Sequence, residues 1–190
     1  MYEKSKEFFN SFNSIFDTNS PTREIAVNEY PHTKSFTEFI IAQINKIIAS
    51  QGLQPQNEYF RIDSMGYQSR WRELNKKTSF NPHLWDLEIA VEHENDPKDW
   101  LDEVIKLAHI CCPLRVVIGY APCTKRHKDM ELLDYAAKAL KKLNCLDNAL
   151  KGEFLIILGN CQTQNKVENY FNYKAYVLDT NKIQFVELEQ

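Results

Sequence analysis

The sequence lacks the features that are typical of membrane-inserted and exported proteins. Among its 190 residues, no apolar run reaches the ~18 to 20 residues that a transmembrane helix needs. The amino-terminal stretch MYEKSKEFFNSF mixes charged and aromatic residues and has no continuous apolar segment of a secretory signal. We therefore expect a cytoplasmic protein without a membrane partner.

Paired cysteines are also missing. The five cysteines are odd in number, are irregularly spaced and form no CxxC pair; they are Cys111, Cys112, Cys123, Cys145 and Cys161. A disulfide framework needs an even set, and a cysteine zinc site needs closely spaced pairs. Neither is predicted, which agrees with a reducing compartment.

A surplus of basic residues, which is typical of nucleic-acid-binding surfaces, is absent from the total charge. Lys and Arg number 23, Asp and Glu number 26, and the formal net charge is −3. The distribution is uneven, because residues 86–103 contain eight acids and one base. The five bases of residues 104–128 have no acid among them. The position of the charges is therefore more informative than their sum.

Hydrophobic patterning predicts an α/β protein, a single domain over residues 1–190 in which helices flank a mixed sheet. Helices are expected at 3–16, 35–50, 97–110 and 128–143, the last with a possible continuation to 150, and strands at 57–67, 84–94, 114–120, 153–159, 173–179 and 182–188. Two prolines in residues 20–35 suggest an extended arm. A turn is expected at Met65–Gly66 within the first extended segment.

The segment 84–94 has an unusual density of carboxylates on one face of a predicted strand. Alternation separates Trp85, Leu87, Ile89, Val91 and His93 from Asp86, Glu88, Ala90, Glu92 and Glu94. Four neighbouring carboxylates repel one another, and acids are poor strand formers. Either this face is solvated, or a divalent cation bound by the acids offsets the repulsion. In the second case Glu92 and Glu94, at the far end, are the candidate ligands.

An acid on a neighbouring strand supplies a partner for this group. Asp63 directly follows the strand-like EYFRI, so it stands where a strand of the same sheet would end. Aspartate is also a common turn residue, so a turn before Ser64 equally explains why an aspartate stands at position 63. Because His93 alternates onto the apolar face with Val91, we expect it to be packed and hydrogen-bonded rather than to act as a base.

The arrangement Asp63…Glu92-His93-Glu94, preceded by a helix that contains Glu38, resembles the PD-(D/E)XK, or restriction endonuclease-like, nuclease superfamily. The resemblance covers residues 35–120 and implies an αβββαβ core. On this basis, residues 1–34 add an N-terminal helix and arm, and residues 121–190 add a helix and further strands.

The resemblance implies a Mg²⁺ or Mn²⁺ site formed by Asp63, Glu92 and Glu94, with Glu38 as a further acid from the first helix. The sequence departs from the motif, since no proline precedes Asp63 and Glu94 stands in the usual place of the lysine. This is an ExE-type variant. Lys106, on the next predicted helix, is the candidate replacement for that lysine, although a surface row of salt bridges with Asp99 and Glu103 explains it as well.

The implied chemistry is hydrolysis of a phosphodiester in nucleic acid, with DNA favoured over RNA. Lys125, Arg126 and Lys128 open a predicted helix and are candidates for phosphate binding, although a solvated helix entry also explains them. Bases and aromatic residues alternate in a predicted hairpin, which suggests base stacking and phosphate contacts there; they are Arg61, Arg70, Arg72, Tyr59, Tyr67 and Trp71.

Two other functions remain open. The missing motif lysine and the absence of a strong basic surface favour a catalytically inactive nuclease-fold protein that acts as a binding or interaction module. A generic α/β domain with a solvated acidic strand is the third alternative. The aromatic N-terminal helix and the C-terminal strands are candidates for a homodimer interface.

Overall fold

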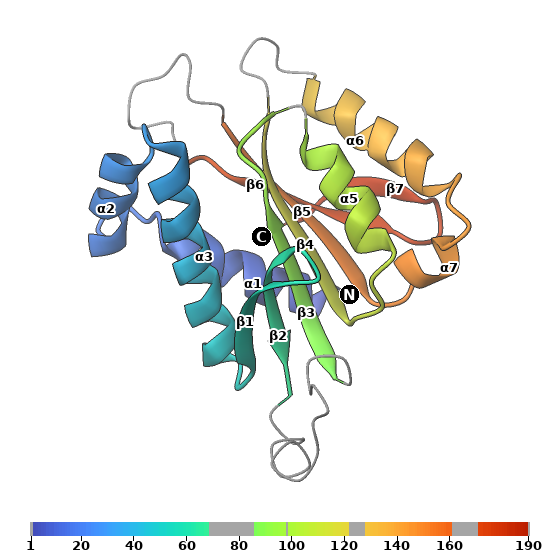
Figure 1. Cartoon of the computed structure of the whole chain (residues 1–190). Helices are drawn as coiled ribbons and strands as arrows, with labels where there is room; N and C mark the ends of the chain where they lie inside the picture. Colours follow the sequence, from blue (N-terminus) through green and yellow to red (C-terminus); the bar gives the residue numbers. More distant parts are fainter. Residues whose placement is uncertain (1, 69–85, 98, 122–127, 161–170, 190) are drawn as a thin grey trace, which may run out of the picture.

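The computed structural model describes residues 2–68, 86–97, 99–121, 128–160 and 171–189 (Figure 1). The elements in chain order are α1 (Glu3–Ser14), α2 (Pro21–Glu29), α3 (Thr33–Ser50), β1 (Gln54–Tyr59), β2 (Ile62–Tyr67), β3 (Leu87–His93), α5 (Trp100–Ala108), β4 (Leu114–Ala121), α6 (Lys128–Leu140), α7 (Leu146–Ala149), β5 (Glu153–Asn160), β6 (Lys174–Asp179) and β7 (Gln184–Glu187). No helix within the described ranges is long and apolar enough to cross a membrane.

The strands of the described chain form one seven-stranded sheet, whose spatial order β1 to β7 is also the sequence order. β1, β2 and β3 make an antiparallel meander. β4 is parallel to β3, and β5 is parallel to β4, whereas β6 and β7 return antiparallel. Each parallel connection contains a helix, as a crossover between parallel strands requires. The predicted α/β class with a mixed sheet is confirmed.

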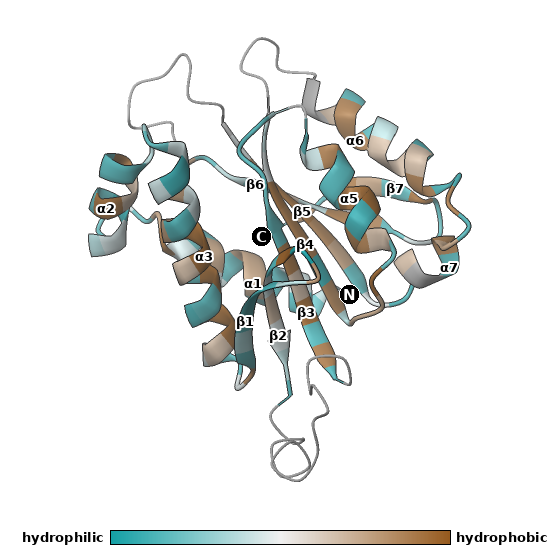
Figure 2. Ribbon diagram, viewed as in Figure 1, coloured by the Kyte–Doolittle hydropathy of each residue, from teal (hydrophilic) through white to brown (hydrophobic). Residues whose placement is uncertain are grey.

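Each face of the sheet is covered by a hydrophobic layer. α1 and α3 pack on one face through side chains that include Phe8, Phe12, Phe36, Ile40 and Ile44. α5 and α6 pack on the other through side chains that include Trp100, Val104, Leu107, Leu133 and Leu140. Figure 2 shows apolar helix surfaces turned toward the strands on both sides. The central strands are therefore buried on both faces, and a polar side chain there must find a partner within the protein.

Glu153, the first residue of β5, caps α1. Its Oε2 accepts a hydrogen bond from the backbone N–H of Ser5 at 2.7 Å, and its Oε1 accepts one from Lys4 N–H at 3.3 Å. Tyr2, the residue before the helix, supplies no side-chain cap of its own. A carboxylate at a helix N-terminus satisfies unpaired N–H groups and interacts favourably with the helix dipole. This contact fixes α1 to the central sheet.

The region predicted as an extended arm contains the helix α2. Ser20 has extended backbone angles before Pro21, which takes the first helical turn. Proline is favoured there because its missing N–H is not needed and its φ suits a helix. Pro31 follows shortly after the helix ends, where a proline cannot continue it. The prediction of an arm was wrong because both prolines mark helix boundaries.

Several predicted boundaries also differ. The turn expected at Met65–Gly66 is absent, because β2 continues through both residues and the hairpin turns at Phe60–Arg61, between the paired residues Tyr59 and Ile62. The predicted helix 35–50 begins at Thr33 and the predicted helix 97–110 at Trp100, while residues 128–150 divide into α6 and α7. Arg70, Trp71 and Arg72 of the predicted hairpin lie outside the described residues.

Strand β3 contains an irregularity that interrupts its alternation. Gly66 pairs with Ile89 and Tyr67 pairs with Leu87, so Glu88 has no partner of its own on β2. A residue inserted in this way is a bulge, which reverses the facing of the residues before it. Leu87 accordingly packs in the same layer as Ala90, whereas it was predicted to share a face with Ile89. Alternation from Ile89 to His93 follows the prediction.

Candidate active site

Asp63 and Glu92 stand side by side on the adjacent strands β2 and β3. The antiparallel register pairs Ser64 with Val91, so Asp63, the residue before Ser64, comes opposite Glu92, the residue after Val91. Oδ2 of Asp63 accepts a hydrogen bond from the backbone N–H of His93 at 2.8 Å. Glu92 is almost fully buried, with 1% of its surface exposed. Glu92 is therefore not part of a solvated acidic face.

Lys106 of α5 completes the group. Its Nζ lies 2.8 Å from Oε1 of Glu92 and 2.5 Å from Oε2 of Glu103, which is one turn earlier on the same helix. The ammonium also donates to the backbone oxygen of Arg61 at 3.0 Å. The structure thus brings the acids of two strands and the predicted lysine together, and we call Asp63, Glu92, Glu103 and Lys106 the carboxylate–lysine cluster.

The protonation of this cluster is governed by burial. Burial raises the pKa of Glu92 to about 8, reinforced by the charges of Asp63 and Glu103 and opposed by Lys106. Burial also raises the pKa of Asp63, although the hydrogen bond from His93 N–H, the charge of Lys106 and a hydrogen bond with Glu92 work against it. Burial alone would lower the pKa of Lys106, but its bonds to Glu103 and Glu92 raise it. Burial thus favours the protonated form of Glu92, while the acidic partners of Lys106 favour its charged form.

His93 lies behind the cluster, on the opposite face of β3. Its Nε2 shares a hydrogen bond of 3.0 Å with the hydroxyl of Tyr120, which lies 3.3 Å from the hydroxyl of Tyr173. Burial lowers the pKa of His93 to about 3, so the ring is neutral. The prediction of a packed, hydrogen-bonded histidine is confirmed. The contribution of His93 to the cluster is its backbone N–H.

Glu94 and Glu38 lie apart from the cluster. Oε1 of Glu94 accepts a hydrogen bond from the backbone N–H of Asp96 at 2.7 Å, beyond the end of β3. Glu38 is exposed on α3 and lies 3.9 Å from Lys34. Glu38 and Asp63 nevertheless line the same cavity, which measures about 280 Å³ and lies between α3 and the β1–β2 hairpin. Asn45 also lines this cavity. Asp63 therefore connects the buried cluster to an open cavity.

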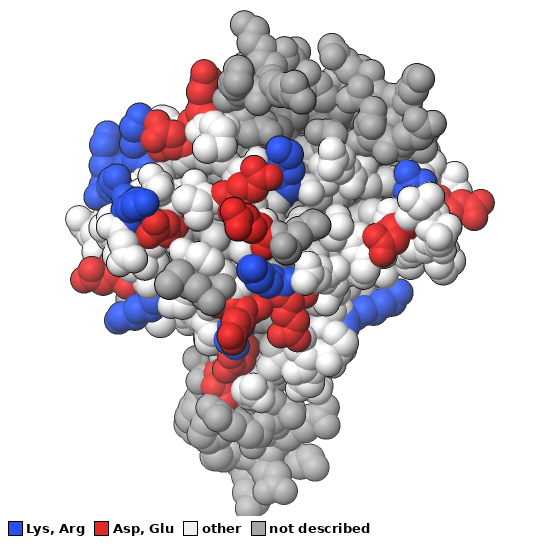
Figure 3. Space-filling view, turned by 180° about the vertical axis from the view of Figure 1, so that it is seen from behind, with Lys and Arg blue, Asp and Glu red and all other residues white. Residues whose placement is uncertain are grey.

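The predicted phosphate-binding residues add little to the described site. Lys125 and Arg126 lie outside the described residues, and Lys128 begins α6 without a described side chain. Arg115, which belongs to the same basic segment, is fully buried under the sheet and cannot contact a partner. Figure 3 shows the face opposite to that of Figure 1, where acidic side chains gather near the middle and Lys and Arg side chains lie mainly at the upper left and singly elsewhere among the described atoms.

Sequence reasoning undervalued Glu103, which was assigned only to a surface row of salt bridges. Its spacing of three residues from Lys106 was visible, and that spacing brings two side chains together on a helix. The involvement of the β1–β2 turn was not foreseen, since the Phe60–Arg61 pair has no turn signal.

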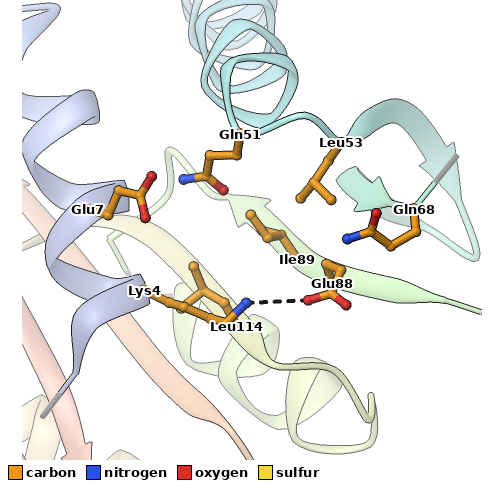
Figure 4. A pocket seen from close by; sticks show the side chains of 8 residues that line it. All are labelled: Lys4, Glu7, Gln51, Leu53, Gln68, Glu88, Ile89 and Leu114. Carbon is orange, nitrogen blue, oxygen red and sulfur yellow. Dashed lines mark hydrogen bonds and ion pairs between the residues drawn. The ribbon is translucent and has the colours of Figure 1, made fainter.

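A second cavity lies on the other side of the sheet, where the bulge directs Glu88 (Figure 4). Oε2 of Glu88 lies 3.3 Å from Nζ of Lys4 on α1. The cavity measures about 210 Å³ and is lined also by Gln51 and Gln68. Glu88 therefore anchors α1 and is separated from Glu92.

The donor set suits a hard cation only in part. Within the described ranges, no three His, Cys, Asp or Glu side chains form a group that could hold a metal ion. Mg²⁺ often takes one or two carboxylates and keeps several waters, so the pair Asp63 and Glu92 has suitable chemistry. Comparison with protein-family models gives no match, and a search of the curated proteins gives none either.

Proposed function

We propose that the protein is a divalent-metal-dependent nuclease that hydrolyses phosphodiester bonds of nucleic acid. The observation that supports this proposal is the convergence of Asp63, Glu92 and Lys106 from two strands and a helix. The order α3-β1-β2-β3-α5-β4, with β4 parallel to β3, agrees with the αβββαβ core that the nuclease resemblance implies.

Each residue of the cluster has a role in this proposal. Asp63 is oriented by the His93 N–H, and Asp63 and Glu92 are the oxygen donors for Mg²⁺ or Mn²⁺. Such a cation, when bound, polarises the phosphate and lowers the pKa of a water from ~16 toward ~7. Lys106 stabilises negative charge on the phosphate oxygens. Glu103 keeps the Lys106 ammonium directed toward the strand ends, since it contacts the same Nζ.

One observation favours the second candidate, a catalytically inactive nuclease-fold binding module. The Lys106 ammonium already contacts three oxygens, those of Glu92, Glu103 and Arg61. A buried carboxylate with a cationic partner needs no metal for charge compensation. In this case the cluster stabilises the fold and the protein binds its partner without hydrolysis.

The two candidates differ in how they respond to Mn²⁺. A ligand at ten times its Kd stabilises the folded protein by about 1.4 kcal/mol. In a domain of this size that corresponds to a rise in Tm of about 3–5 °C. We expect this rise in the wild type and in Asp134→Asn, a control at an exposed acid on α6. Asp63→Asn and Glu92→Gln should abolish the rise, and a wild type without any rise would rule out the nuclease.

Hydrolysis is tested separately. Labelled single-stranded DNA, duplex DNA and RNA are incubated with Mg²⁺ or Mn²⁺ and examined by gel electrophoresis. We expect cleavage by the wild type that Glu92→Gln loses and Asp134→Asn retains. Cleavage that persists in Glu92→Gln would come from a contaminant or another site. Metal binding without cleavage of any of these substrates would contradict the proposed hydrolysis.

A further inference from the structure

The β1–β2 turn presents an aromatic ring next to the carboxylate–lysine cluster. Phe60 is 65% exposed, and Tyr59 contacts it edge-on with ring centroids 4.7 Å apart. Arg61 is exposed as well, and its backbone oxygen accepts the hydrogen bond from Lys106. The turn extends toward α5 in Figure 1. The turn that carries the ring and the guanidinium is therefore linked, through the Arg61 backbone oxygen, to the ammonium that contacts Glu92.

The backbone of this turn is one that Phe and Arg rarely adopt. The pairing of Tyr59 with Ile62 leaves two residues in the turn, and φ is 53° at Phe60 and 61° at Arg61. Positive φ at both central positions defines a type I′ turn, for which Asn-Gly is strongly preferred. A side chain with a Cβ is strained in this region. The turn therefore carries two side chains that its geometry disfavours.

Burial of the two turn side chains does not explain this choice, since both are exposed. Ile62, on the far side of the turn, is buried and fixes the hairpin to the layer beneath α5. The Phe60 ring contacts Tyr59, which packs against that layer, yet Phe60 remains 65% exposed. Where a local rule is broken without a packing gain, a functional role of the side chains is the usual reason.

We infer that the Phe60–Arg61 turn binds unpaired bases, so that the substrate of the site is single-stranded or locally unpaired nucleic acid. This inference rests on the proposed nuclease function. An aromatic ring stacks on the face of a base, and in a duplex both faces of each base are already covered by its neighbours. An exposed ring therefore distinguishes unpaired from paired strands, while Arg61 contacts the adjacent phosphate.

The test measures binding in the absence of hydrolysis. Fluorescence anisotropy in EDTA at low salt gives the Kd of labelled oligothymidine and oligouridine about twelve nucleotides long, and of a hairpin duplex. We expect the wild type to prefer both single strands to the duplex. Phe60→Ala should weaken single-strand binding by about 5- to 100-fold and leave duplex binding unchanged. Tyr135→Ala removes a ring that is 63% exposed on α6 and should change neither.

A double variant separates recognition from turn strain. Phe60→Asn with Arg61→Gly creates the Asn-Gly turn and should raise Tm while single-strand affinity falls. Tm raised with affinity unchanged would overturn the inference, as would a wild type that binds single strand and duplex equally or binds neither. Hydrolysis combined with equal binding of single strand and duplex would support the nuclease and reject its preference for unpaired bases. Single-strand preference without hydrolysis would reject the nuclease, but binding of unpaired bases by the Phe60–Arg61 turn would stand.

Discussion

Trp100 of α5 stands directly over Gly119 of β4. A Cβ at position 119 would lie 2.7 Å from Cγ of Trp100 and 2.8 Å from its Cβ, which is closer than two carbon atoms can pack. Both Trp100 atoms are near the helix backbone, so a rotation of the ring cannot relieve the contact. Because Gly119 has no side chain, α5, the helix that carries Lys106, can pack closely against the sheet.

We expect Gly119→Ala to displace α5 and to destabilise the protein by about 1–3 kcal/mol, as overpacking does. Urea denaturation measures the loss. The same shift should separate Lys106 from Glu92 and alter the response of Tm to Mn²⁺. Asn10→Ala, which introduces alanine at an exposed position of α1, is the control. Wild-type stability of Gly119→Ala would contradict this account of how α5 is seated.

Glu92 and His93 should make stability depend on pH in opposite directions. Between about pH 4.5 and 8, folded Glu92 keeps a proton that the unfolded chain has lost, so the free energy of unfolding falls as pH rises. Between about pH 3 and 6.5, His93 is neutral when folded and protonated when unfolded, so stability rises with pH. The two effects oppose each other in the overlap of these ranges.

Above about pH 6.5 only the effect of Glu92 remains, so the free energy of unfolding should fall with rising pH. The slope should be at most about 1.4 kcal/mol per pH unit. Urea denaturation between about pH 6 and 9 measures it. Glu92→Gln should remove this decline, and the exposed Glu187→Gln should retain it. Parallel curves for Glu92→Gln and the wild type would show that Glu92 is ionised in the folded protein at neutral pH.

Sequence reasoning predicted those parts of the fold in which one physical pattern dominates. The alternation from Ile89 to His93 is correct because each face of the strand meets a different layer. The bulge at Glu88 could not be predicted, since one inserted residue leaves no compositional signal. Gly66 suggested a turn, but it serves close packing instead, because a Cβ there would lie 2.8 Å from Ile48.

The candidate site was predictable to the extent that it follows from strand adjacency. Glu92 was placed correctly near the end of its strand. Asp63 was expected at the end of a strand but is the second residue of β2, and it reaches the same edge of the sheet because β2 runs antiparallel to β3. Glu94 could not be placed in the same way, because the strand ends at His93 and the chain turns to the Asp96 N–H. The Phe60–Arg61 turn was hidden because its residues contradict the local preference.

Arg115 should be important for stability rather than for binding. Its guanidinium donates to the backbone oxygen of Ile110 at 3.1 Å and to that of Lys151, and it lies 5.4 Å from the ring centre of Phe154. Arg115→Met leaves two carbonyl groups without this donor and should cost about 3 kcal/mol. The exposed Lys142→Met is the control, and urea denaturation measures both. An unchanged free energy for Arg115→Met would show that other donors replace the guanidinium.

The Lys106 ammonium and a divalent cation would compete for the same carboxylates. Lys106→Met removes a positive charge 2.8 Å from Glu92, so Mn²⁺ affinity measured by calorimetry should increase by about tenfold. Hydrolysis should nevertheless fall by about 10²- to 10³-fold, because the charge that stabilises the phosphate oxygens is lost. Lys138→Met, which breaks an exposed ion pair with Asp134, should change neither. Loss of Mn²⁺ binding in Lys106→Met would show that the ammonium organises the carboxylates instead of competing with the metal.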